Sequence, residues 1–142
     1  MAAGLLRHAL APLQEPLRSL RILSAGVSAR EDDPVTPHSV TALRKVGIDI
    51  SGQRSRRLTQ QMLDGALAVF CMTEAHRAMI RAMASPPPQH LHLLREFMPE
   101  GQPREIADPY GGPLGVYEAC RDEMVEAIPS VLRYLKTRLG AG

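Results

Sequence analysis

The chain has 142 residues, a formal net charge of +2 and an apolar fraction of 44%. These values suit one globular domain with a hydrophobic core. A net charge so close to zero gives no indication of nucleic-acid binding. We therefore expect a single domain over residues 1–142 and no nucleic-acid partner.

The apolar segments and the two cysteines bear on the compartment. No apolar run approaches the roughly 20 residues of a membrane span, so we expect no membrane partner. Cys71 and Cys120 lie in apolar segments and make no disulfide framework, which favours buried free thiols in a reducing environment. Residues 1–13 have no small-residue cleavage site after a continuous apolar core, which excludes a signal peptide. The expected location is cytoplasmic.

The predicted elements begin with a helix over residues 1–13, where leucines and alanines recur at helical spacing. Residues 20–23 predict a short strand that ends in a turn of small residues. A second helix opens at Thr36, an N-cap candidate, and Pro37 suits its first position. Gly47 then ends this helix.

The second half of the chain predicts two further strands and two helices. The continuous apolar run 67–72 is typical of a strand buried on both faces of a parallel sheet. Thr73 is expected to cap a helix that runs to about Met83. Residues 90–94 predict another short strand. A long terminal helix follows, and Pro129 should kink it or remove one of its hydrogen bonds.

This order of elements predicts an α/β fold with three layers, a small parallel sheet flanked by helices. Such folds usually begin with a central strand, and their ligand loop follows that strand. Here the chain starts with residues that already form a helix. We therefore expect the fold to lack its usual first central strand.

Residues 108–112 (Asp-Pro-Tyr-Gly-Gly) form the most informative segment. Taken alone they favour a tight turn, with Asp and Pro at its start and Gly at its end. The functional interpretation makes Asp108 the donor of a proton to a leaving oxygen and Tyr110 a wall of the substrate pocket. Such an acid needs a loop that shields it enough to raise its pKa.

Five other segments favour the functional interpretation. They are residues 24–27, 36–38, 47–51, 54–59 and 72–77. Together with the Asp108 loop they resemble the low-molecular-weight protein-tyrosine phosphatases. The most similar branch is the bacterial one that includes protein-arginine phosphatases and arsenate-reductase-like members. The resemblance covers residues 1–139 and implies the phosphotyrosine phosphatase I-like fold.

The resemblance also implies a mechanism. In that family a loop of the pattern Cys-x-Gly-Asn-x-Cys-Arg-Ser lies between the first strand and the first helix. Its Cys attacks phosphorus, its Arg clamps the oxygens, and backbone N–H groups cradle the phosphate. By resemblance, Asp108 is the general acid and Tyr110 binds substrate. No cofactor and no metal are implied.

The nucleophile of the family corresponds to no residue of this chain, because Met1 stands where the residues after the loop begin. We therefore expect a domain that is N-terminally truncated relative to the family and inactive as written. Residues 71–77 fit the bare pattern Cys-x5-Arg. They contain no Gly and are typical of a strand end followed by a capped helix, so we do not expect Cys71 to be the nucleophile.

Two further groups of polar residues have alternative interpretations. Arg54, Arg56 and Arg57 form the only dense basic cluster, interpreted as a solvated loop, with an anion-recruiting patch as the alternative. His38 and His76 are interpreted as surface helix residues rather than metal ligands, because no second ligand stands at metal spacing.

The sequence thus favours a phosphatase that acts on protein phosphotyrosine, or on phosphoarginine, through a phosphocysteine. Its substrate would be a phosphoprotein or a small phosphomonoester, and Tyr110 favours an aromatic one. The alternative is a non-catalytic phosphatase-fold remnant or binding module. A third hypothesis, an arsenate-reductase-like protein, ranks last because the two cysteines are not placed as resolving thiols.

Overall fold

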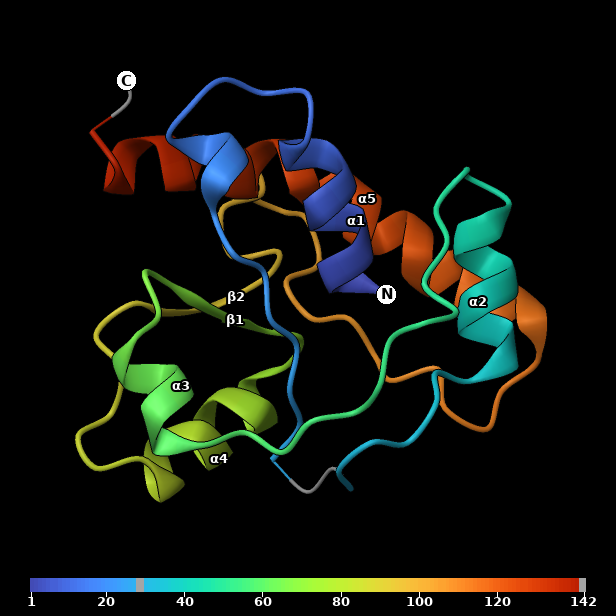
Figure 1. Ribbon diagram of the computed structural model, residues 1–142, viewed down its shortest axis with the longest axis horizontal. Helices are drawn as coiled ribbons and strands as arrows, with labels where there is room; N and C mark the ends of the chain where they lie inside the picture. Colours follow the sequence, from blue (N-terminus) through green and yellow to red (C-terminus); the bar gives the residue numbers. More distant parts are fainter. Residues whose placement is uncertain (28–29, 141–142) are drawn as a thin grey trace.

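A computed structural model describes residues 1–27 and 30–140 of the protein (Figure 1). The helices are α1 (Ala2–Leu10), the short 3-10 helix η1 (Leu17–Ser19), α2 (Pro37–Arg44), α3 (Gln60–Asp64), α4 (Glu74–Met83) and α5 (Leu114–Arg138). The strands β1 (Val69–Cys71) and β2 (Leu91–Leu93) pair in parallel, with Phe70 opposite His92. In the described ranges no helix is long and apolar enough to cross a membrane.

The sheet lies between two groups of helices, α1, α2 and α5 on one side and α3 and α4 on the other (Figure 1). Alternate residues of β1 face the two groups, as expected of a strand. Phe70 packs against the cluster that contains Leu5 and Val131. Cys71 is buried in the second cluster with Leu63 and Ile80. The predicted α/β fold, a small parallel sheet flanked by helices, is confirmed.

The junction between β1 and α4 follows the sequence closely. The apolar run gives a strand whose last residue, Cys71, is buried. The hydroxyl oxygen of Thr73 accepts a hydrogen bond of 3.2 Å from the backbone N–H of His76, which caps α4 as predicted. The strand predicted over residues 90–94 is confirmed as β2.

The prediction of a strand over residues 20–23 is wrong. This segment is extended, but it forms no ladder in the part of the chain that the structure describes. The carbonyl of Ile22 accepts a hydrogen bond of 2.7 Å from the Arg7 guanidinium rather than from a neighbouring strand. The nearest bridge is the isolated one between Gly26 and Arg57. An apolar pattern predicts burial, whereas a strand also needs a paired backbone.

The helices differ from the prediction in smaller ways. α1 ends at Leu10 rather than near residue 13. α3 was not predicted, although Thr59 caps it by accepting the Met62 N–H at 3.2 Å. Thr36 holds the N-cap position of α2, but its hydroxyl donates to Ser39 Oγ. α5 continues through Pro129 to Arg138.

Candidate active site

The Asp108 loop is fixed to the end of β1 by its backbone. The N–H of Ile106 donates a hydrogen bond of 3.0 Å to the carbonyl of Met72, the residue after β1. The side chain of Ile106 is buried, with 1% of its surface exposed. The chain therefore leaves the core only two residues before Asp108, and the start of the loop has little freedom.

Two hydrogen bonds shape the loop itself. The backbone N–H of Tyr110 donates to Asp108 Oδ1 at 3.0 Å, and the N–H of Gly112 donates to the Pro109 carbonyl at 2.9 Å. The turn thus begins at Pro109, one residue later than the sequence pattern indicates. Gly111 has φ +82°, a conformation that favours glycine. The chain then enters α5 after Pro113, its N-cap.

Asp108 and Tyr110 line one cavity of about 300 Å³. Side chains from α4, α5, the start of α2 and the residue after β1 form its walls. They include Thr36, Ser39, Met72, His76, Tyr117, Cys120 and Met124. Tyr110 stands at the rim with 78% of its surface exposed. The structure therefore places the two predicted site residues together at the end of β1, where parallel α/β sheets usually bind ligands.

The loop does not shield Asp108 as predicted. The Asp108 side chain is exposed, because the Asp108–Tyr110 hydrogen bond and the following turn hold it at the surface. Any shielding of the acid must therefore come from a bound substrate rather than from the loop alone.

Cys71 lies outside this cavity, at the buried end of β1. Its Sγ is 3.5 Å from the carbonyl oxygen of His92 and 3.8 Å from that of Thr73. Burial raises the pKa of the Cys71 thiol to about 11. At neutral pH this group is a thiol, whereas a nucleophilic cysteine needs the thiolate.

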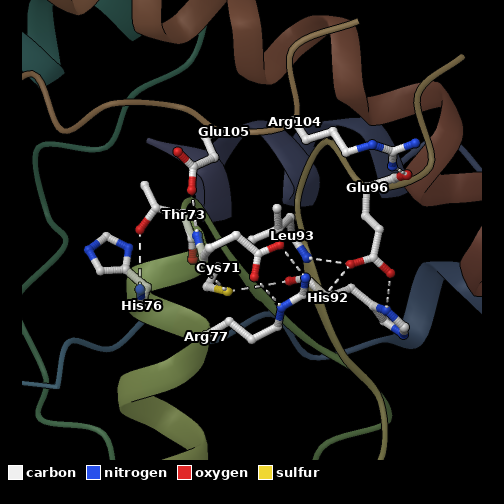
Figure 2. Close-up of polar contacts among 10 residues, drawn as sticks. Cys71, Thr73, His76, Arg77, His92, Leu93, Glu96, Arg104 and Glu105 are labelled. Atoms are coloured by element: carbon white, nitrogen blue, oxygen red, sulfur yellow. Dashed lines mark hydrogen bonds and ion pairs between the residues drawn. The ribbon is translucent and has the colours of Figure 1, made fainter. Parts of the chain in front are cut away.

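The groups that would have to bind phosphate beside Cys71 are already paired (Figure 2). At the start of α4, the N–H of Glu74 donates to Glu105 Oε2 at 2.7 Å. The Arg77 guanidinium contacts the carboxylates of both Glu74 and Glu96. Residues 71–77 are thus a strand–helix junction in which the Glu74 N–H and the Arg77 guanidinium are bound by carboxylates of the protein itself.

Cys120 was not predicted to lie near Asp108, yet it lines the same cavity from α5. Its Sγ is 3.8 Å from the carbonyl of Ala107 and the residue is 4% exposed. Burial raises the pKa of this thiol to about 11 as well. Both cysteines are free and buried, as the sequence predicted.

The two histidines of interest differ in position. His38 is exposed on α2, with its ring 5.3 Å from that of Tyr117. His76 is half-buried on α4 and lines the Asp108 cavity, a place that was not predicted. Its signal was its place one turn after the end of a buried strand. Across residues 1–27 and 30–140, no group of His, Cys, Asp and Glu side chains is arranged to hold a metal ion.

Residues 1–140 match the family model described as low molecular weight phosphotyrosine protein phosphatase. The chain belongs to this family. The predicted resemblance to low-molecular-weight protein-tyrosine phosphatases is therefore confirmed. The match extends over the Asp108 loop, both strands and all the helices described above.

Curated relatives and solved structures of low-molecular-weight phosphatases agree with this assignment. The chain is 34% identical to a protein-arginine-phosphatase of Geobacillus stearothermophilus, over 96% of this chain and 87% of the relative. It is 30% identical to one of Bacillus subtilis, over 83% and 77%. The crystal structure of a low molecular weight protein tyrosine phosphatase from T. tengcongensis superposes with a TM-score of 0.83 at 29% identity, covering 94% and 88% of the two chains.

Proposed function

We propose that this protein is a low-molecular-weight protein phosphatase that acts through a phosphocysteine, with Asp108 as its general acid. The observation that supports this role is the shared cavity of Asp108 and Tyr110 at the end of β1, in a chain of this family. The substrate is a phosphorylated protein side chain or a small phosphomonoester. The reaction needs no cofactor.

Asp108 acts in both halves of the proposed reaction. The nucleophile of this reaction is the cysteine of the family's Cys-x-Gly-Asn-x-Cys-Arg-Ser loop, not Cys71 or Cys120. When its sulfur attacks phosphorus, the bond to the leaving group breaks and the protonated Asp108 carboxyl gives its proton to that group. The Asp108 carboxylate then takes a proton from water, whose oxygen attacks phosphorus and releases the cysteine and inorganic phosphate. The hydrogen bond from Tyr110 N–H to Oδ1 fixes the carboxyl plane and leaves Oδ2 for these transfers.

Tyr110 forms the outer wall of the proposed pocket. Its ring is 78% exposed at the rim of the cavity, so substrate binding would cover a large aromatic surface. A flat leaving group beside this ring would also exclude water from Asp108. Such desolvation favours the neutral form of the carboxyl, which is the form that donates a proton.

Neither cysteine of the 142-residue chain is proposed as the nucleophile. Cys71 lies outside the Asp108 cavity, and Cys120 lines it, but burial raises the pKa of each thiol to about 11. The Glu74 N–H at the start of α4 and the Arg77 guanidinium are paired with protein carboxylates. We therefore expect these 142 residues alone to have no phosphatase activity, which keeps the non-catalytic binding module as the alternative.

Hydrolysis of p-nitrophenyl phosphate tests the proposal. The 142-residue chain is compared with a loop-bearing form, in which the same chain follows a strand and a loop of the pattern Cys-x-Gly-Asn-x-Cys-Arg-Ser. Activity that appears only in the loop-bearing form and falls in its Asp108→Asn variant supports the assignment. Activity of the 142-residue chain that is lost in Cys71→Ser would instead make Cys71 the nucleophile.

Phosphoarginine is the second candidate substrate. It is favoured by the two curated relatives named protein-arginine-phosphatase, at 34% and 30% identity. Tyr110, in contrast, suits an aromatic phosphoester. Rates of phosphate release from a phosphoarginine peptide and a phosphotyrosine peptide of the same sequence decide between them. Arsenate reduction remains the third hypothesis, and the buried sites of Cys71 and Cys120 in separate clusters count against it.

The cytoplasm is the proposed location. Both cysteines are free and buried, which suits a reducing compartment.

A further inference from the structure

A second cavity of about 300 Å³ shares no lining residue with the Asp108 cavity and carries three arginines. It is formed by α1, the extended segment after η1 and the loop before α3. Its lining residues are Arg7, Leu23, Ser24, Gly52, Gln53, Arg54 and Arg56. None of these described lining residues is acidic, so the positive charges lie together without a carboxylate among them.

The backbone of the loop aims two of the arginines into this cavity. Ser55 faces the opposite way, where its N–H donates to the Asp33 carbonyl at 2.8 Å and its Oγ accepts from the Asp33 N–H at 2.9 Å. Residues on either side of a position in extended chain point to the other face. Arg54 and Arg56 therefore share one face, and the hydrogen bond from Gly26 N–H to the Arg56 carbonyl at 2.9 Å holds it in place.

The third arginine is fixed by a different element. Arg7 lies on α1, and its Nη2 donates to the Ile22 carbonyl at 2.7 Å. This bond orients the guanidinium beside Leu23 and Ser24 and leaves its other nitrogens available. Within residues 1–27 and 30–140, Arg54 makes one long contact, 3.4 Å to the Gln53 carbonyl, and the Arg56 side chain makes no hydrogen bond.

Three guanidiniums around one small cavity repel each other, and an anion between them removes that repulsion. Guanidinium groups bind phosphate through paired, charge-assisted hydrogen bonds. The lining has no aromatic ring on which a nucleic-acid base could stack. A phosphate group without a base is therefore the ligand that this set of donors suits.

We propose that Arg7, Arg54 and Arg56 form a second anion site, which binds a phosphate group away from the Asp108 cavity. The phosphate is either free inorganic phosphate or a phosphorylated side chain of a protein. The basic cluster of the sequence thus divides. Arg54 and Arg56 line the site, whereas Arg57 does not line it, and its backbone N–H donates to Glu31 Oε1 at 2.6 Å. This proposal does not rest on the proposed phosphatase activity, because its test measures phosphate binding and not turnover.

Titration of the 142-residue chain with inorganic phosphate, followed by calorimetry and by amide NMR shifts, tests the site. In Arg54→Gln/Arg56→Gln the dissociation constant should rise at least about tenfold, because several charge-assisted hydrogen bonds are lost. The matched control Arg44→Gln/Arg81→Gln removes the same charge from exposed helical positions and should bind as the parent does. Shifts should concentrate at Ser24 and Gly52.

A second variant keeps the arginines and fills the site. Ser24→Asp places a carboxylate among them and should also weaken phosphate binding, with an unchanged melting temperature because Ser24 is exposed. Equal affinity of parent and Arg54→Gln/Arg56→Gln would overturn the proposal. NMR shifts confined to the Asp108 cavity, or no phosphate binding by the parent chain, would overturn it as well. A phosphotyrosine peptide run in parallel assigns the source: the ligand that binds more tightly through Arg54 and Arg56 is the natural one.

Discussion

Nη1 of Arg77 lies 2.6 Å from Oε1 of Glu96, and this ion pair joins α4 to the segment after β2 (Figure 2). The other oxygen of Glu96 lies 2.7 Å from His92 Nδ1. The side chains of Arg77 and Glu96 are only 17% and 25% exposed, so water competes less than at a surface pair. Glu96 thus connects α4, through Arg77, to β2, through His92.

Replacing Glu96 should weaken this connection. Glu96→Gln removes the charge that pairs with Arg77 and leaves poorer hydrogen bonds, so the free energy of unfolding should fall by about 1–3 kcal/mol. Urea denaturation measures the change. Glu100→Gln, at an exposed position in the same region, is the control and should change little. Equal stability of the two variants would contradict the role given to Glu96.

The same residue should make stability depend on acid pH. Burial acts to raise the pKa of Glu96, but hydrogen bonds from His92 and the Leu93 N–H, with the charge of Arg77, outweigh it and lower the pKa below 4.5. A lowered folded-state pKa gives stability that is present above the unfolded value and lost as pH falls through the folded one. The difference in melting temperature between parent and Glu96→Gln should therefore shrink below about pH 4.5. A difference that grows in acid would refute this assignment.

The two thiols should be unreactive in the folded chain. Burial raises the pKa of Cys71 and Cys120 to about 11, so a thiol reagent such as DTNB should label neither at pH 7 until denaturant is added. Because the unfolded thiols ionise near 9.0, their contribution to stability is present below that pH and is lost as pH rises toward 11. Rapid labelling of one native thiol would show a more accessible site than the structure has.

Gly111 should be required for the shape of the Asp108 loop. Its φ of +82° is costly for any residue with a Cβ, so Gly111→Ala should lower the free energy of unfolding by about 1–2 kcal/mol. Gly115 is a matched control near the start of α5, where a Cβ would meet nothing within 4 Å. Gly115→Ala should raise stability by about 0.5–1 kcal/mol. Thermal melts of both variants test the pair, and the prediction fails if their effects have the same sign.

Asp108 should matter for turnover and not for folding. In the loop-bearing form, Asp108→Asn should lower kcat by about 10²–10⁴-fold, the usual contribution of a positioned acid. The melting temperature should stay within error because the side chain is exposed. Asp64→Asn, on α3, controls for the loss of one carboxylate. A kcat that is unchanged in Asp108→Asn would remove Asp108 from the mechanism.

The sequence predicted those parts of the fold whose signals are local. Thr73 is followed by helix-forming residues, and the apolar run before it has no polar position, so β1 and α4 were placed correctly. The segment 20–23 is apolar except at Arg21, yet it is no strand in the described residues. Whether extended chain becomes a strand depends on a hydrogen-bonding neighbour, and such a neighbour is distant in sequence.

The candidate site was predictable only where a motif carried it. Asp108 and Tyr110 stand in one contiguous segment and both line one cavity, while their roles as general acid and substrate-binding residue stay predictions. Cys120 reaches the same cavity from α5, and nothing in its own surroundings indicates this, whereas the only signal for His76 was its place one turn after β1. The convergence of separate helices on one cavity is a property of tertiary packing. The division of Arg54 and Arg56 from Arg57 likewise became visible only with the direction of the loop.

The hydrogen bond from Ile106 to Met72 has a consequence for how this enzyme family can diversify. It fixes the start of the Asp108 loop through main-chain atoms, so the place where the proposed proton donor leaves the core does not depend on the side chain at position 110. The side chain at position 110, at the exposed rim, can then change as long as the residue keeps the N–H that donates to Asp108 Oδ1. Under the proposed function, such changes would admit new leaving groups while the acid stays in place, whereas a proline at position 106 would remove the N–H that ties the loop to the end of β1.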